Sequence, residues 1–181
     1  MQGVNVTEEK RRMLGEARKA AELYKRLAGT VTRVTCDDGT HLDIRWNASN
    51  FAHLCGLDYY ADDKRTRRLP ARRLYVDLLS NAKIPAKRVA PTGDAGWLSK
   101  KADVIAQAFD LTQARIIVES GNSRIRIYLG NETWCIGLGR TNETDAYYPQ
   151  SVRKGPAIKE KLPGTSIHQI TQIETITQYT A

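Results

Sequence analysis

Three short β-rich runs in the last third of the chain place the strongest limit on its fold. They cover residues 115–119, 124–129 and 133–139, and the segments Ser120-Gly121-Asn122-Ser123 and Gly130-Asn131-Glu132 separate them. Glycine and asparagine adopt the positive φ angles that tight turns need, so consecutive antiparallel strands are favoured. The sequence therefore predicts a β-meander with one face on a core.

The middle run, residues 124–129, alternates apolar and polar side chains. Successive side chains of a strand point to opposite faces of the sheet. We therefore expect a core face and a cationic face. The core face would carry Ile125, Ile127 and Leu129, and the cationic face Arg124, Arg126 and Tyr128.

Two further β-rich runs, residues 30–36 and 41–46, flank Asp37-Asp38-Gly39-Thr40, which is a strong hairpin signal. Residues 166–179 are rich in Ile and Thr and predict a closing strand. Between meander and closing strand, residues 144–154 read as irregular, and a short helix is expected over 158–162.

Helical spacing of apolar residues predicts a first helix over residues 7–27, with Thr7 as its cap, and a later one over 97–109. A helix over 64–81 is expected to break or kink near Pro70, and 84–93 reads as a loop. The fold class is therefore α+β, with amino-terminal helices packed on an antiparallel β-sheet formed mainly by the carboxyl-terminal third. We expect one domain over residues 1–181, with 1–8 flexible.

The net charge of +8 and the pI near 9.5 make nucleic acid the first candidate partner, because a cationic surface attracts polyanions. Residues 64–73 hold six of the basic side chains. The alternative is that this run is a solvated face without a ligand.

No apolar run approaches the ~20 residues that span a bilayer, and no secretory signal is visible at the start. Three separated cysteines without a C-x-x-C pair argue against disulfides and a thiolate zinc site, and they favour a reduced protein in a cytoplasm. Sequence motifs of P-loop, dinucleotide-binding, zinc-protease and serine-hydrolase enzymes are missing. We expect neither a metal nor a cofactor.

The segment Asn50-Phe51-Ala52-His53-Leu54-Cys55-Gly56-Leu57 reads as a short helix that ends at glycine. Its apolar residues recur at i, i+3 and i+6, which leaves His53 beside the buried stripe. Such an element can present an imidazole to a cleft. The alternative is a hydrogen-bonded structural histidine.

Histidine, arginine, tyrosine, serine and lysine side chains can cleave RNA without a metal. The reaction needs a base for the 2′-hydroxyl, an acid for the leaving 5′-oxygen and cations at the phosphate. Histidine suits either proton role at neutral pH, arginine binds phosphate, and tyrosine stacks on unpaired bases.

The sequence resembles a group of phage-associated nucleases with the barnase, EndoU, colicin and RelE-like (BECR) fold, specifically the fourth phage group. The resemblance begins at Ala21-Glu22-Leu23-Tyr24 and includes residues 50–57, which match an N-F-x-H-L-x-G block. It resumes at Tyr147-Tyr148-Pro149-Gln150-Ser151, similar to a Y-x-P-x-S/T segment, and at the closing strand. Cys55 stands where the group suggests a threonine.

The resemblance implies a ribonuclease, often a toxin in conflict between phages and bacteria. It makes His53 the leading base or acid and places Ser151 and Tyr148 in the second motif. Alternatives are a helix cap for Ser151 and a structural turn for Tyr148-Pro149. To these we add Arg126 as a catalytic candidate, from charge and strand face. The expected RNA-binding residues are Arg65, Arg67, Arg68, Arg72, Arg73, Tyr128, Arg140, Arg153 and Lys154.

Our leading hypothesis is a metal-independent endoribonuclease that leaves a 2′,3′-cyclic phosphate. Its expected partners are RNA, including tRNA, and a cognate inhibitor or antitoxin protein. Two alternatives remain open: a catalytically silent module that binds RNA or a protein partner, and a transferase that uses a nucleotide.

Overall fold

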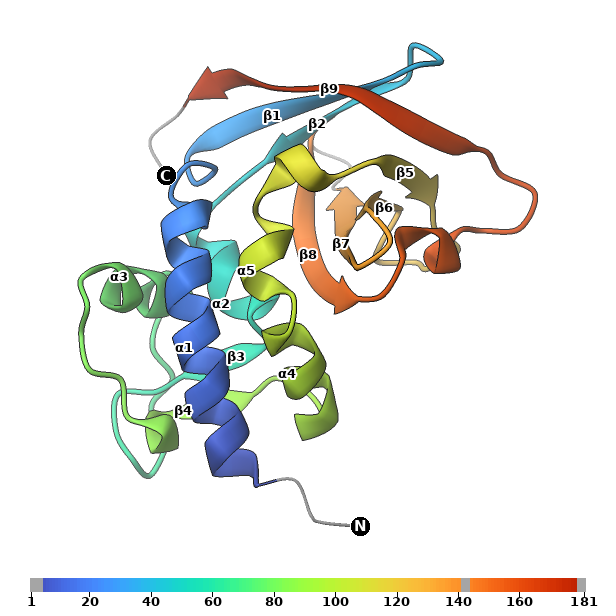
Figure 1. The fold of residues 1–181 in the computed structure, drawn as a ribbon. Helices are drawn as coiled ribbons and strands as arrows, with labels where there is room; N and C mark the ends of the chain where they lie inside the picture. The colour runs from blue at the N-terminus through green and yellow to red at the C-terminus, as the bar shows by residue number, and fades with distance from the viewer. Residues whose placement is uncertain (1–4, 141–143, 179–181) are drawn as a thin grey trace.

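The β-rich runs from both ends of the chain join into one closed barrel in the computed structural model, which describes residues 5–140 and 144–178 (Figure 1). The strand order around the barrel is β1-β2-β8-β7-β6-β5-β9. The strands are β1 Thr30–Cys36, β2 His41–Arg45, β5 Ile116–Glu119, β6 Ile127–Gly130, β7 Trp134–Arg140, β8 Tyr147–Lys154 and β9 Ile167–Gln178.

The barrel corrects the prediction of an antiparallel sheet formed mainly by the carboxyl-terminal third. The predicted hairpin is present, and it supplies β1 and β2 to the same sheet. The predicted closing strand β9 is 12 residues long, which lets it pair with both β1 and β5. A parallel contact between Ile44 of β2 and Tyr147 of β8 completes the circle. Closure pairs the two edge strands of this seven-stranded sheet with each other. The separate β-rich runs in the sequence do not show which strands lie at the edges.

Strand β8 also corrects the interpretation of residues 144–154 as irregular. Its register with β7 sets Ser151 opposite Gly137 and Pro149 opposite Leu138, so Gln150 is one extra residue in the strand. This is a β-bulge, a site where a proline without an N–H group is tolerated. The proline and the bulge hide the strand from simple pattern analysis.

The expected alternation along residues 124–129 is wrong at Ile125 and Tyr128. Strand β6 starts only at Ile127, and Ile125 and Tyr128 pack together in a second, smaller core. The space for them depends on Gly137, because a Cβ there would lie 2.8 Å from Ile125 Cδ1 and 3.0 Å from Tyr128 Cε1. The face of β6 that carries Tyr128 is therefore buried instead of cationic, and Arg126, which precedes the strand, is exposed.

Helix α1, Val6–Tyr24, confirms the first predicted helix, with Asn5 in place of Thr7 as its cap. The Asn5 side chain accepts hydrogen bonds from the backbone N–H groups of Thr7 and Glu8 at 3.2 and 3.4 Å. The remaining helices are α2 Phe51–Leu54, α3 Arg73–Leu79, α4 Ala95–Ala102 and α5 Ile105–Ala108. Single 3₁₀ turns are η1 Ala48–Asn50, η2 Ala86–Arg88, η3 Leu111–Gln113 and η4 Ala157–Glu160.

The helix predicted over residues 64–81 is correct only for its second part, α3. Residues 64–72 form a loop in which Arg65 has a φ of 57°, a value that helices do not use. Residues 84–93, expected as a loop, contain β4 (Val89–Pro91), which pairs with β3 (Leu57–Tyr59). The helix expected over 97–109 is divided into α4 and α5.

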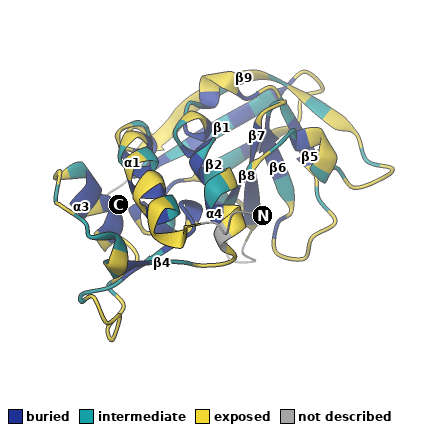
Figure 2. Ribbon diagram, turned by 60° about the horizontal axis from the view of Figure 1, so that its bottom comes forward, coloured by how far each residue is buried: buried dark blue, intermediate teal, exposed yellow. Residues whose placement is uncertain are grey.

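One hydrophobic core joins the helices to the strands of the barrel, and Figure 2 shows buried residues in both. An aromatic cluster stands at the junction: Tyr24 of α1 contacts the rings of Trp46, Phe51, Tyr75 and Phe109 at centroid distances of 4.9 to 5.9 Å. This cluster fixes α2 against the barrel. Within the described ranges, no helix is both long enough and apolar enough to cross a membrane.

Candidate functional site

Helix α2 presents His53 as the sequence predicted. Phe51 and Leu54 are fully buried, whereas His53 is exposed on the same short helix. Gly56 follows with a φ of +71°, the left-handed conformation expected at the end of this element. The apolar residues anchor the turn, and the imidazole remains accessible.

The bulge of β8 holds the α2 segment through two backbone contacts. The Asn50 side chain donates a hydrogen bond from Nδ2 to the carbonyl oxygen of Pro149 at 3.1 Å. The His53 ring is hydrogen-bonded to the backbone of Gln150, the extra residue of the bulge. The two sequence blocks that carry the family resemblance, residues 50–57 and 147–151, therefore meet in space.

Lys101 of α4 adds an amine to this site. Its Nζ donates a hydrogen bond to the carbonyl oxygen of Leu54 at 3.1 Å, one residue after the histidine. Its aliphatic stem lies against Gly56, where a Cβ would come within 3.1 Å of Lys101 Cδ. Burial lowers the pKa of Lys101 from 10.5 to about 8. The amine can therefore exchange a proton close to neutral pH.

The surroundings of His53 lower the pKa of its ring below 6.5. Partial desolvation is the largest cause, and the positive charge of Lys101 is the second. Asp58 and the hydrogen bond to Gln150 act in the opposite direction, and Arg68 lowers the pKa slightly further. The imidazole is therefore mainly neutral at pH 7, so it can accept a proton.

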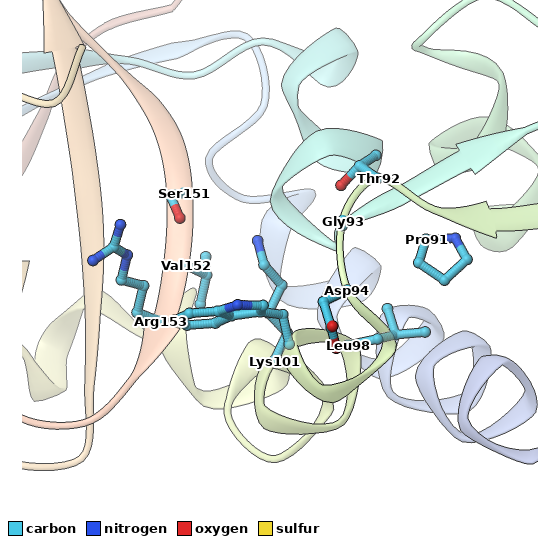
Figure 3. A pocket seen from close by; sticks show the side chains of 11 residues that line it. Pro91, Thr92, Gly93, Asp94, Leu98, Lys101, Ser151, Val152 and Arg153 are labelled. Atoms are coloured by element: carbon cyan, nitrogen blue, oxygen red, sulfur yellow. The ribbon is translucent and has the colours of Figure 1, made fainter. Parts of the chain in front are cut away.

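A pocket of about 200 Å³ opens beside Lys101, between β8 and the loop that precedes α4 (Figure 3). Ser151 and Arg153 are two residues apart on β8 and both line it. Figure 3 shows the Lys101 amine between the strand that carries Ser151 and the loop at Thr92. The complete lining is Gly56, Pro91, Thr92, Gly93, Asp94, Trp97, Leu98, Lys101, Ser151, Val152 and Arg153.

Of the predicted residues, Ser151 and Arg153 line this pocket together with Lys101, and His53 is not part of its lining. Ser151 is a strand residue, so the alternative that it caps a helix is wrong. The guanidinium of Arg153 is oriented by Glu160 at 3.0 Å, and it lies 5.3 Å from the ring centroid of Tyr128. Its charge also lowers the pKa of Lys101, which places it within electrostatic reach of the amine.

Other predicted residues lie in different places. Arg126 and Arg140 line a separate open hollow, where Arg140 pairs with Asp145 at 2.8 Å. Tyr148 is also a strand residue, which excludes the turn alternative, and its hydroxyl accepts a hydrogen bond from Gln150 Nε2 at 2.7 Å. Tyr128 is only 1% exposed, so its ring has no face open to a base.

The arginine loop, residues 60–73, forms a second cationic region. Arg68 pairs with Asp58, and Arg73 pairs with Asp77 at 2.9 Å. A basic hollow of about 420 Å³ lies beside this loop. Its lining is Tyr59, Ala61, Arg67, Leu69, Arg73, Asp77, Ala82, Lys83 and Arg88. Of the other predicted contacts, Arg65 donates to the Lys87 carbonyl oxygen, Arg72 precedes α3, and Lys154 pairs with Asp103.

The cysteine thiols are buried, and possible metal ligands are dispersed among the residues that the structure describes. In the part of the chain that the structure describes, no three His, Cys, Asp or Glu side chains gather as a metal site. Cys36, Cys55 and Cys135 are buried and unpaired. Burial raises the pKa of the Cys36 thiol to about 11 and those of Cys55 and Cys135 to about 12, so all three remain protonated.

Lys101, Ser151 and Arg153 share one pocket, and His53 lies on the neighbouring helix α2, within electrostatic reach of Lys101. An imidazole, an amine of lowered pKa, a hydroxyl and a guanidinium are groups that can transfer protons and bind an anion. The chain belongs to the family described as phage-Barnase-EndoU-ColicinE5/D-RelE like nuclease4, whose model matches residues 18–175. The class is therefore a nuclease of the BECR type, and the predicted resemblance is confirmed. Comparisons with curated proteins and with solved structures gave no match.

Proposed function

We propose that this protein is a metal-independent endoribonuclease that leaves a 2′,3′-cyclic phosphate and a 5′-hydroxyl. The observation that carries the proposal is the exposed ring of His53, held by the β8 bulge beside Lys101. The family match supports nuclease activity. The side chains of this site support RNA as the substrate. RNA supplies its own nucleophile, the 2′-hydroxyl, so the protein needs proton transfer more than an activated water.

The lowered pKa values divide the proton-transfer roles between the two groups. His53, neutral at pH 7, takes the proton of the 2′-hydroxyl as its oxygen attacks phosphorus. Lys101, protonated below about pH 8, gives a proton to the 5′-oxygen as the P–O5′ bond breaks. One proton is taken and one is given, so the step balances without a co-reactant.

Arg153 and Ser151 serve the phosphate in this scheme. A guanidinium holds its charge throughout and binds two phosphate oxygens at once, which stabilises the growing negative charge. Glu160 fixes this side chain, and the Ser151 hydroxyl is available as a neutral donor from the same strand. The two proton-transfer side chains, His53 and Lys101, thus lie on α2 and α4, whereas the two phosphate-binding side chains lie on β8.

The arginine loop and the basic hollow attract the rest of the RNA. Between residues 58 and 88 the chain has nine lysine and arginine residues against four aspartates. This excess steers a polyanion toward the molecule without reading its sequence. We further propose that the activity serves as a toxin or effector in conflict between phages and bacteria, with a cognate inhibitor in the producing cell.

The test is cleavage of an RNA panel in EDTA, comparing the parent with His53→Ala and with His41→Ala. His41 is an exposed histidine on β2, so its substitution controls for loss of an imidazole elsewhere. We expect the parent and His41→Ala to cut RNA with cyclic-phosphate ends, and His53→Ala to be inactive. Equal cleavage by His53→Ala would refute the assignment, and salt-sensitive RNA binding without any product would favour the silent binding module.

A further inference from the structure

Trp97 differs from the other two tryptophans of the chain. Trp46 and Trp134 are 0% exposed, whereas Trp97 is 51% exposed on α4. The buried side of this helix is supplied by Leu98 and Ala102, so the fold itself does not need an indole at position 97. The exposed indole is therefore available to a ligand, and aromatic side chains are enriched at binding sites.

Trp97 lines the same pocket as Lys101 and Ser151. Pro91, Leu98 and Val152 add apolar surface there, and Thr92 contributes a hydroxyl (Figure 3). An apolar concavity with a few convergent polar groups is the usual form of a small-ligand site. The pocket can therefore receive a flat, mainly apolar group beside the catalytic amine.

The charges around the pocket indicate that this group is attached to an anion. Lys101 and Arg153 line the pocket, and the Lys100 ammonium lies over one face of the Trp97 ring, 5.1 Å from its centroid, which leaves the other face for a ligand. Asp94 is the carboxylate at the rim, and its Oδ1 already accepts a hydrogen bond from the Gly96 N–H at 2.6 Å. An aromatic ring beside several cations fits a nucleotide, whose base stacks while its phosphate meets the cations.

We propose that this pocket is a nucleobase subsite, in which Trp97 stacks on an unpaired base next to the phosphate that is cut. This inference rests on the proposed ribonuclease function and names the form of its substrate. A base inside a duplex has both faces covered by neighbours, so it cannot enter the pocket and stack on the indole. The substrate is therefore a single strand, a loop or an end of RNA.

The fluorescence of Trp97 provides a test that does not depend on cleavage. A 2′-O-methyl RNA hexamer lacks the nucleophile, so the parent protein binds it without cutting it. Because Trp46 and Trp134 are fully buried, quenching by this hexamer reports mainly on Trp97. We expect saturable quenching by the single strand, little by the same sequence as a duplex, and none of this signal in Trp97→Phe.

Kinetics on single-stranded RNA supply the second measurement. We expect Trp97→Ala to raise KM about tenfold with little change in kcat, and Trp97→Phe to remain close to the parent, because phenylalanine also stacks. Ile176→Ala is the control, since Ile176 is an exposed apolar residue on β9. Trp97 is exposed, so these variants are expected to fold.

The outcomes separate the subsite from the nuclease function. If the parent cuts RNA, but the hexamer does not quench and Trp97→Ala behaves as the parent, the subsite is wrong and the nuclease assignment stands. If the hexamer quenches and binds Trp97→Ala more weakly, but no RNA is cut, the subsite stands and the nuclease assignment fails. Equal quenching by single strand and duplex would overturn the requirement for an unpaired base.

Discussion

Lys101 and the arginine loop both carry positive charge, but their environments are opposite. Lys101 is half-buried under α2, and its pKa is lowered to about 8. In the loop, the side chains of Arg68 and Arg73 are 63% and 57% exposed, and each pairs with an aspartate. Lys101 is a cation in a desolvated place, whereas the loop holds a group of cations exposed to water.

The contrast separates proton transfer from electrostatic attraction. An amine of lowered pKa can lose and regain a proton near pH 7, whereas a guanidinium stays charged at any pH at which the protein is folded. Salt screens the interactions of exposed charges beyond the Debye length, which is about 10 Å at 0.1 M ionic strength. We therefore expect Lys101 to control kcat and the loop to control affinity.

The largest expected effect follows from Lys101→Met. Methionine keeps much of the stem that packs against Gly56 and removes the amine, so kcat should fall by about 100-fold or more with the fold retained. Lys19→Met on the exposed face of α1 is the matched control. Single-turnover cleavage and thermal unfolding measure the two quantities. An undiminished kcat in Lys101→Met would remove the amine from the reaction.

The pH dependence of kcat/KM should be bell-shaped. The reaction needs neutral His53, whose population rises with pH through a pKa below 6.5. It also needs protonated Lys101, whose population falls above about pH 8. Away from the plateau the rate changes about tenfold per pH unit. In Lys101→Arg the alkaline limb should move to higher pH, and an unchanged limb would assign it to another group.

Substitutions in the basic hollow should have a smaller effect, on binding alone. Arg67→Gln with Lys83→Gln should weaken RNA binding severalfold and reduce the salt slope by about 0.7 for each lost phosphate contact. The catalytic rate at saturating RNA should stay constant. A salt titration of affinity for the parent and the double variant measures this. A drop in kcat at saturation would show that the loop takes part in the chemistry.

The smallest expected effect concerns the turn that supports both His53 and Lys101. Gly56→Ala places a Cβ at a φ of +71° and within 3.1 Å of Lys101 Cδ. We expect a loss of about 1 kcal/mol in stability and a modest decrease in kcat, because the lysine stem must shift. Gly39→Ala is the control, because Gly39 has a similar φ but no atom near its added Cβ. The comparison separates the effect of backbone strain from that of the contact with Lys101. Equal kcat values for the two variants would show that the contact is unimportant.

Local patterns predicted the histidine but not the amine. Phe51 and Leu54 mark the buried stripe of α2 directly in the sequence, so the position of His53 followed from spacing. Lys101 reads as an ordinary charge on a helix surface. One signal was present: Leu98, Lys101, Ala102 and Ile105 follow the i, i+3, i+4, i+7 spacing of a core face, which places the lysine among buried residues.

Long-range features of the fold could not be read from spacing. The pairing of β9 with both β1 and β5 depends on where distant strands meet, which no local pattern records. The β8 bulge lies at Gln150, within the segment that was interpreted as irregular. The site depends on this bulge, since it supplies the contacts to Asn50 and His53. The sequence therefore indicated the residues of both motifs and not the contact between them.

The most direct test of the central claim uses an RNA whose scissile 5′-oxygen is replaced by sulfur. A thiolate leaves without a proton, so the substrate bypasses the general acid but still requires the general base. With Lys101→Met, this RNA should be cut at nearly the rate of the parent protein, while His53→Ala should stay inactive. Rescue of His53→Ala instead, or of neither variant, would contradict the roles assigned to the two side chains.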